Sequence, residues 1–196
     1  MILELSAACE RNKAPILGVL AVELADCRGV LEIGSGTGQH AVYFSAKLPS
    51  LIWQPSDTPE YLPTLRERIA REGGPNLRPP LELDVRRHPW PLACTDGLFS
   101  ANTLHIMSWS SVQQFFHGVG SVLSPGGVLC VYGPFRYSGR YTSESNADFD
   151  QFLRARDPQS GIRDFEQVDD LARAQGLRLA ADHAMPANNQ TVVWRR

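Results

Sequence analysis

The chain has 196 residues, of which 43% are hydrophobic and 20% charged, and its formal net charge is −2. This balance excludes a disordered chain, a collagen-like fibre and a coiled-coil rod, and it lacks the basic excess of a nucleic-acid-binding protein. The longest apolar stretch, Ala14 to Leu24, is too short to span a bilayer. We therefore expect one domain over residues 1–196, with no nucleic-acid and no membrane partner.

The first twelve residues lack the basic and apolar regions of a signal peptide, and the four cysteines form no C-x-x-C pair. Small buried cysteines in a reducing compartment are the simplest interpretation, so the expected location is cytoplasmic.

Strand and helix patterns alternate along the chain. A helix is predicted to start with Pro15 in its first turn and to end before Gly29. Helices are then predicted at 39–48, 61–72 and 112–123, and strands at 30–33, 51–54, 81–83, 98–101 and 128–132. This alternation is typical of a doubly wound α/β fold with a mainly parallel sheet.

The last third of the chain departs from this alternation. Phe135 to Asn146 is predicted to be a loop, and a helix follows at about 149–156. Asp164 and Gln167 resemble a capping box that opens a helix ending at Gln175. Two closing strands are predicted at 177–181 and 191–194.

The strongest motif is Val30-Leu-Glu-Ile-Gly34-Ser-Gly36-Thr-Gly38-Gln-His40. Glycines in such a turn allow positive φ and close approach of a ligand, and N–H groups beside a helix N-terminus bind anions. A dinucleotide motif would need glycine at position 39, where the chain has Gln39, and no P-loop lysine is present. What remains is an acid, Glu32, before three alternating glycines; a glycine turn without a ligand is the alternative.

This turn resembles motif I of the class I S-adenosylmethionine-dependent methyltransferases. The resemblance implies a Rossmann-like, seven-stranded sheet that ends in an antiparallel strand pair, with S-adenosylmethionine as cofactor. It also implies cofactor contacts from the turn itself, namely Glu32, Gly34, Ser35, Gly36, Gly38, Gln39 and His40.

Polar residues follow the next three predicted strands. Asp57 ends the second strand region, where a carboxylate can accept both ribose hydroxyls; a helix N-cap is the alternative. The resemblance implies that Asp84 reaches the adenine amino group while the N–H of Val85 reads a ring nitrogen; a carboxylate in solvent is equally expected. Asn102 can touch the methionine end of the cofactor or the substrate.

Further segments resemble the methyltransferase-like 26 / domain-of-unknown-function 938 family. They are Glu10-Arg11-Asn12-Lys13, Asn102-Thr-Leu-His105-Ile, Gly133-Pro-Phe135, Ser143-Glu-Ser-Asn146, Gly161-Ile-Arg163-Asp164 and Met185-Pro-Ala-Asn188-Asn189. The resemblance implies the fold and the cofactor, and it names no substrate.

These segments supply the predicted lids and substrate contacts. Arg11 and Asn12 are expected to bind the cofactor from a lid of residues 1–14, and a solvated charge run is the alternative. Arg163 can pair with an anionic substrate group or with Asp164, and Asn188-Asn189 can form a tight turn. The predicted substrate residues are Tyr132, Phe135, Tyr141, Asn146, Arg163, Asn188 and Asn189.

Aromatic residues cluster after the fifth predicted strand. Tyr132, Phe135, Tyr137 and Tyr141 are expected to line an acceptor pocket, and residues 135–146 to close over it as a second lid. Packing of these rings in the core is the alternative.

His105 is the predicted catalytic base, because a neutral imidazole accepts a proton at cytoplasmic pH; packing beside Ile106 and Trp109 is the alternative. The other histidines show no metal-ligand spacing, so no metal is expected. The predicted function is S-adenosylmethionine-dependent methyl transfer to a small-molecule acceptor. The alternatives are a non-catalytic cofactor-binding or partner protein on the same fold, and a nicotinamide oxidoreductase, against which Gln39 counts. The oligomeric state stays open.

Overall fold

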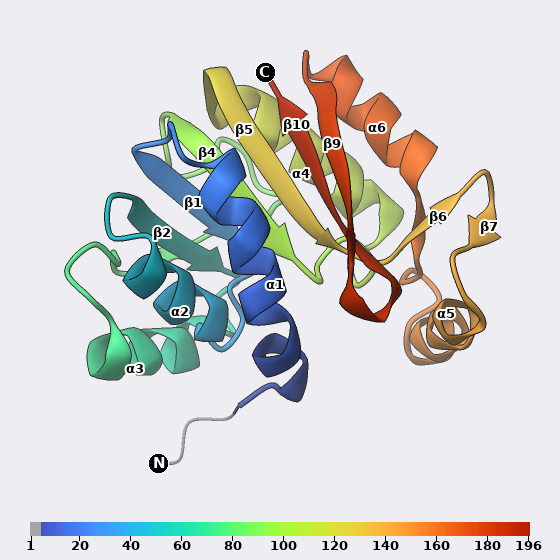
Figure 1. The fold of residues 1–196 in the computed structure, drawn as a ribbon, viewed down its shortest axis with the longest axis horizontal. Helices are drawn as coiled ribbons and strands as arrows, with labels where there is room; N and C mark the ends of the chain where they lie inside the picture. Colours follow the sequence, from blue (N-terminus) through green and yellow to red (C-terminus); the bar gives the residue numbers. More distant parts are fainter. Residues whose placement is uncertain (1–4) are drawn as a thin grey trace.

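The computed structural model describes residues 5–196, and its central feature is a seven-stranded sheet in the order β3-β2-β1-β4-β5-β10-β9 (Figure 1). The first five strands are parallel, and β10 is antiparallel to both β5 and β9. The strands are β1 (Gly29–Ile33), β2 (Ile52–Asp57), β3 (Leu81–Glu82), β4 (Thr95–Ala101), β5 (Leu123–Gly133), β9 (Arg178–Met185) and β10 (Asn189–Arg195). The predicted doubly wound sheet with a C-terminal antiparallel pair is confirmed.

Helices cover both faces of this sheet (Figure 1). One face packs against α1 (Ala7–Glu23) and α2 (Gln39–Lys47), with α3 (Leu62–Glu72) beside α2. The other face packs against α4 (Trp109–Val122) and α6 (Phe165–Ala174). Successive side chains of a strand point to opposite faces, so neighbours in β5 enter different cores.

A second, three-stranded sheet lies beyond β5, in the order β7-β6-β8. The segment predicted as a loop, residues 135–146, is instead a hairpin followed by the start of a helix, because β6 pairs with β8 far along the chain. We call residues 135–164 the cap. Its elements are β6 (Phe135–Tyr137), β7 (Arg140–Tyr141), α5 (Glu144–Arg156) and β8 (Arg163–Asp164).

The first helix begins earlier than predicted, and the predicted capping box at the start of α6 is absent. Helix α1 begins at Ala7, because the side chain of Ser6 accepts a hydrogen bond from the N–H of Cys9, and Pro15 lies inside the helix. Asp164 stands at the N-cap position of α6, but its side chain makes no capping hydrogen bond there. It pairs with Arg136 instead, at 2.8 Å, so the capping box does not form.

No helix within residues 5–196 is long and apolar enough to cross a membrane.

Candidate functional site

The glycine-rich turn between β1 and α2 has positive φ angles at Gly34, Gly36 and Gly38. A β carbon at Gly34 would lie 2.5 Å from Thr103, and one at Gly38 would lie 2.8 Å from Leu65. A β carbon at Gly36 would have nothing within 4 Å. The outer glycines are therefore required by packing, whereas the middle one borders open space at the sheet edge. We call this open space the cradle.

Hydrogen bonds to residues of β2 and α3 hold the glycine-rich turn in place. The carbonyl of Ser56 accepts hydrogen bonds from the N–H groups of Gly34 and Ser35, at 3.1 and 3.0 Å. The Nε of Arg68, a side chain that is only 2% exposed, donates to the carbonyl of Thr37 at 2.6 Å. Neither Ser56 nor Arg68 is predicted from the sequence as a site residue, because nothing in their local pattern distinguishes them from ordinary strand and helix residues.

Asp57, at the end of β2, borders the cradle. Its Oδ2 accepts the N–H of Gly36 at 2.6 Å, and its Oδ1 accepts the N–H of Thr58 at 2.7 Å. Burial raises the pKa of Asp57, and these hydrogen bonds oppose that rise. Helix α3 has Tyr61 at its N-cap position, so the alternative role of Asp57 as a helix N-cap is wrong. Oδ1 also accepts the hydroxyl of Thr58 at 3.3 Å, a contact that a ligand hydroxyl can replace, and Oδ2 keeps a second lone pair for a ligand hydroxyl.

Glu32 lies inside the sheet beneath the turn and is 2% exposed. Its Oε2 accepts a hydrogen bond from Nε1 of Trp53 at 2.8 Å. Burial raises the pKa of Glu32 to about 7. This acid therefore supports the turn from within the core.

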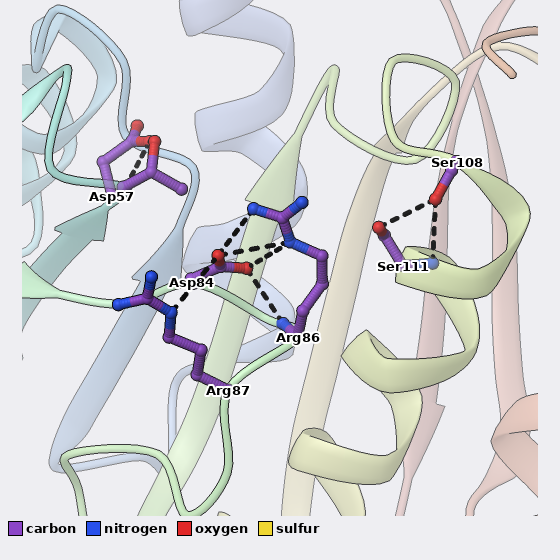
Figure 2. Close-up of polar contacts among 7 residues, drawn as sticks. Asp57, Asp84, Arg86, Arg87, Ser108 and Ser111 are labelled. Atoms are coloured by element: carbon purple, nitrogen blue, oxygen red, sulfur yellow. Dashed lines mark hydrogen bonds and ion pairs between the residues drawn. The ribbon is translucent and has the colours of Figure 1, made fainter.

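Asp84 follows β3, beside Asp57, since the N–H of Leu83 donates to the carbonyl of Asp57 at 2.9 Å. Its carboxylate accepts from Nε and Nη2 of Arg86, at 2.8 and 2.7 Å, and Arg87 lies 3.9 Å away (Figure 2). The hydrogen bond from Arg86 lowers the pKa of Asp84. Asp84 is thus held by Arg86 and is not a free solvent carboxylate, and the next residue, Val85, is buried.

Asn102 follows β4 with a φ of 57°, a left-handed conformation that asparagine tolerates better than most residues. Its N–H donates to the carbonyl of Tyr132 at 2.9 Å. The polar ends of four adjacent strands therefore share one edge of the sheet, the edge at which α/β folds bind ligands.

The N-terminal half of α1 is attached to this edge. Oδ1 of Asn12 accepts from Nε2 of His40 at 2.7 Å, and Asn12 also hydrogen-bonds the Tyr132 side chain. Gln39 donates to Glu10 at 3.1 Å. Burial lowers the pKa of His40 to about 4, so its imidazole is neutral.

The described part of the predicted lid 1–14 is thus mostly helix, on which Arg11 is exposed. Residues 1–4 of that lid lie outside the described residues.

His105 lies in the loop between β4 and α4 and is 5% exposed. Its ring meets that of Phe149 edge-on, with 5.5 Å between centroids. Burial, and then the charge of Arg163, lower the pKa of His105 to about 4. Within residues 5–196, no hydrogen bond reaches either ring nitrogen, and no three His, Cys, Asp or Glu side chains gather to hold a metal ion.

Arg163 fixes the loop that carries His105. Its Nε donates to the carbonyl of Leu104 at 3.0 Å, and its Nη2 donates to the carbonyls of Met107 and Gln159. The expected pair with Asp164 does not form, because Asp164 faces Arg136 across the β6–β8 pairing. Arg163, which is predicted to contact the substrate, is thus hydrogen-bonded to backbone carbonyls of this loop and of the cap.

The model of the family described as "Protein of unknown function (DUF938)" matches residues 3–196. The chain belongs to the DUF938 family.

The DUF938 chain is also similar to solved methyltransferase structures. An O-methyltransferase family protein from Burkholderia thailandensis is 19% identical with a TM-score of 0.81, over 96% of this chain and 57% of that one. An O-methyltransferase family 2 protein from Planctomyces limnophilus, in complex with apigenin, is 16% identical with a TM-score of 0.83, over 96% and 57%. Human N-acetylserotonin methyltransferase, in complex with SAM, is 16% identical with a TM-score of 0.75, over 96% and 58%.

At these identities the likeness shows the fold, which is that of the class I methyltransferases. The DUF938 chain spans a little over half the length of these structures.

The aromatic residues after β5 do not form one pocket in the DUF938 chain, so that prediction is wrong. Tyr132 packs in the core with α1 and α2, whereas Phe135, 1% exposed, packs in the core on the other face. The hydroxyls of Tyr137 and Tyr141 donate to Asp182 and Asp150, each at 2.7 Å. The rings diverge because they belong to different faces and different sheets.

Asn146, Asn188 and Asn189 do come together, where the cap meets the β9–β10 hairpin. Nδ2 of Asn146 donates to the carbonyl of Asn188 at 2.9 Å. Asn188 has a φ of 56°, and Asn189 donates to the carbonyl of Ala187 at 3.1 Å. The two asparagines therefore form the tight turn that sequence analysis gave as an alternative to substrate binding.

Proposed function

We propose that the DUF938 chain transfers the methyl group of S-adenosylmethionine to a small-molecule acceptor. The observation that carries this proposal is the cradle at Gly36, bordered by the Asp57 carboxylate. The class I methyltransferase fold supports it, and the sequence segments that resemble methyltransferase-like 26 agree with it. One domain over residues 1–196, a cytoplasmic location and no nucleic-acid partner belong to the same proposal.

The residues at the cradle fit the cofactor. Open space at Gly36 lets a ligand approach the turn, and Asp57 can accept both ribose hydroxyls. Asp84 and Val85 are assigned to the adenine, with Arg86 keeping the carboxylate ionised. Asn102 is assigned to the methionine end. When bound, S-adenosylmethionine supplies an electrophilic methyl group.

The chain's own task in such a transfer is to align the acceptor and to exclude water. A base is efficient when its pKa lies near the working pH, so burial makes His105, with a pKa of about 4, a weak proton acceptor. We therefore assign His105 to holding the acceptor by a hydrogen bond from its neutral ring. This favours a nucleophile that needs no strong base, such as a thiolate or a neutral ring nitrogen.

Isothermal titration with S-adenosylhomocysteine and S-adenosylmethionine tests the cofactor assignment. Gly36→Val should weaken binding at least about tenfold, because the side chain enters the cradle. Gly126→Val is the matched control, since Gly126 also has a positive φ and open space but lies at the start of β5. Absence of binding to the folded wild-type protein, or equal binding by both variants, would show that the assignment is wrong.

A non-catalytic S-adenosylmethionine-binding protein is the second candidate, favoured by the low pKa of His105. Incubation with S-adenosylmethionine and a panel of thiols and nitrogen heterocycles separates the two. Production of S-adenosylhomocysteine that depends on an acceptor supports the transferase. Tight binding with no product from any acceptor supports the second candidate.

A further inference from the structure

A hollow of about 370 Å³ lies between the start of α4 and the C-terminal end of the cap. Ser108, Trp109 and Ser110 form one wall, and the cap forms the other. Of the described residues that line it, only Arg154 of α5 and Arg163 of β8 carry a charge. We call this hollow the basic pocket.

Both guanidinium groups are held in place by the protein. Nε of Arg154 donates to Asp150 at 2.7 Å, and Arg163 is fixed by backbone carbonyls and lies 6.0 Å from the ring centroid of Trp109. Within residues 5–196, the terminal nitrogens of Arg154 and Nη1 of Arg163 make no hydrogen bond. The guanidinium groups are therefore oriented before a ligand binds, so binding costs less conformational entropy of these side chains.

The two arginines of the basic pocket lie close enough for their charges to act on one another. Burial, and then the charge of Arg154, lower the pKa of Arg163, so the two cations act on one another. Arg136 adds to this effect, whereas Asp150 and Asp157 oppose it. Asp150 is almost fully buried behind Arg154, and Asp157 accepts the N–H of Gln159 at 2.9 Å. An anion in the pocket would relieve the repulsion between the arginines.

The start of α4 adds neutral donors to the same pocket. Ser108 is the N-cap, and its hydroxyl accepts the N–H of Ser111 at 3.2 Å (Figure 2). The hydroxyl of Ser110 lies 3.0 Å from that of Ser108, and the first turn holds no acidic residue. Donors thus come from two arginines, two hydroxyls and a helix N-terminus, an arrangement that suits the several oxygens of a tetrahedral anion.

We propose that the basic pocket binds the phosphate group of a phosphorylated small molecule. The pocket shares a wall with the loop that carries His105, because Arg163 holds the carbonyl of Leu104 and Ser160 donates to the carbonyl of Ile106 at 2.8 Å. The volume leaves room for the organic part of such a molecule beside its phosphate. This site does not depend on methyl transfer or on the cradle at Gly36.

The test is titration of the full chain with inorganic phosphate and with glycerol 3-phosphate, followed by calorimetry. Arg154→Gln should weaken binding about tenfold, through loss of charge-assisted hydrogen bonds. Arg156→Gln is the matched control, since it removes the same charge from α5 but its guanidinium lies over the Phe152 ring, 5.6 Å from the centroid. Absence of saturable binding, or equal weakening by both variants, would overturn the proposal.

A second variant guards against a folding defect in the first. Ser110→Glu places a carboxylate in the first turn of α4, where it favours the helix but repels phosphate from the pocket. We expect a folded protein that no longer binds phosphate. Unchanged phosphate binding by folded Ser110→Glu would contradict the site.

The glycine-rich turn is itself able to bind an anion, so the two sites have to be separated. Phosphate binding should survive Gly36→Val and saturation with S-adenosylhomocysteine; loss under either condition would place the anion at the turn and overturn the proposal. Failure of the proposed cofactor binding would leave this result unchanged. With S-adenosylmethionine added, formation of S-adenosylhomocysteine from glycerol 3-phosphate identifies the phosphate as part of the acceptor, and binding without it identifies a separate ligand.

Discussion

The glycine-rich turn and the cap are built in different ways. The turn is held by neighbours within one β-α-β unit and the helix after it, through Ser56, Asp57 and Arg68. The cap is held by polar pairs between distant segments, such as Arg136 with Asp164, and Asn146 with Asn188. The glycine-rich turn is thus stabilised by local contacts inside the main sheet, whereas the cap depends on contacts between segments that are distant in the sequence.

This difference has a consequence for dynamics. Opening of the cap breaks its own polar contacts and leaves β1, β2 and the turn paired in the main sheet. We therefore expect the cap to open with a lower free energy than global unfolding, as a separate unit in hydrogen exchange. Substitutions in the turn region should then change the free energy of global unfolding. Substitutions in the cap should change the free energy of cap opening, as measured by hydrogen exchange.

The largest effect is expected from Glu32→Gln in the turn region. Burial raises the pKa of Glu32 from 4.5 to about 7. Between these two pH values the folded protein keeps the proton on Glu32, whereas the unfolded chain has lost it. Stability from this group is complete below pH 4.5 and is lost as pH rises through 7, by about 3 kcal/mol. Relative to wild type, Glu32→Gln should gain stability by about this amount between about pH 5 and about pH 8, measured by urea unfolding.

Exposed Glu82→Gln is the control for this experiment and should show no such pH trend. The opening free energy of the cap should stay the same in Glu32→Gln, because cap opening does not expose β1. A difference between variant and wild type that is independent of pH would contradict the buried, titrating Glu32.

The next effect is expected from Asp150→Asn in the cap. Its Oδ1 accepts the N–H of Ile162, and its Oδ2 accepts from Arg154 and Tyr141, each at 2.7 Å. An amide lacks one of these acceptors and the charge, so the opening free energy of the cap should fall by about 2 kcal/mol. Hydrogen exchange of α5 and β8 amides measures it, with exposed Asp148→Asn as control. Equal exchange rates in Asp150→Asn and Asp148→Asn would show that Asp150 does not stabilise the closed cap.

Sequence patterns predicted the conformation of the glycine-rich turn well because its determinants are local. Positive φ at Gly34, Gly36 and Gly38 follows from their spacing between a strand and a helix, and Asp57 follows directly from the end of β2. The burial of Arg68 was not predictable, since a charged residue in an amphipathic helix is usually exposed. The Arg86 partner of Asp84 was also missed, although it lies only two residues away.

The cap was predicted poorly because its structure depends on pairings across the chain. Residues 135–146 have the composition of a loop, and the β6–β7 hairpin within them is fixed by the pairing of β6 with β8. The assignment of Arg163 to Asp164 failed for the same reason, since Arg136 takes Asp164 and leaves Arg163 to the loop of His105. Local propensity contains no information about either partner.

A third prediction sharpens the role of the turn in ligand binding. Asp57→Asn keeps the size of the side chain but removes the charge that would face the ribose hydroxyls. Affinity for S-adenosylhomocysteine should fall at least about tenfold in calorimetry. Exposed Asp26→Asn, at the opposite edge of the sheet, is the control. Unchanged affinity in folded Asp57→Asn would leave the cradle without its ribose acceptor.

The smallest effect is expected from Tyr141→Phe, which removes one hydroxyl from the cap. That hydroxyl donates to the buried Asp150, and Tyr141 itself is 36% exposed. The opening free energy of the cap should therefore fall by about 1 kcal/mol. Because the contact breaks when the cap opens, the loss should appear in the exchange of cap amides that open with α5 and β7. Tyr61→Phe, an exposed tyrosine on the turn side of the molecule, should leave that exchange unchanged. If Tyr141→Phe instead alters only the slowest amides of β1 and β4, the cap does not open separately, and both regions unfold as one unit.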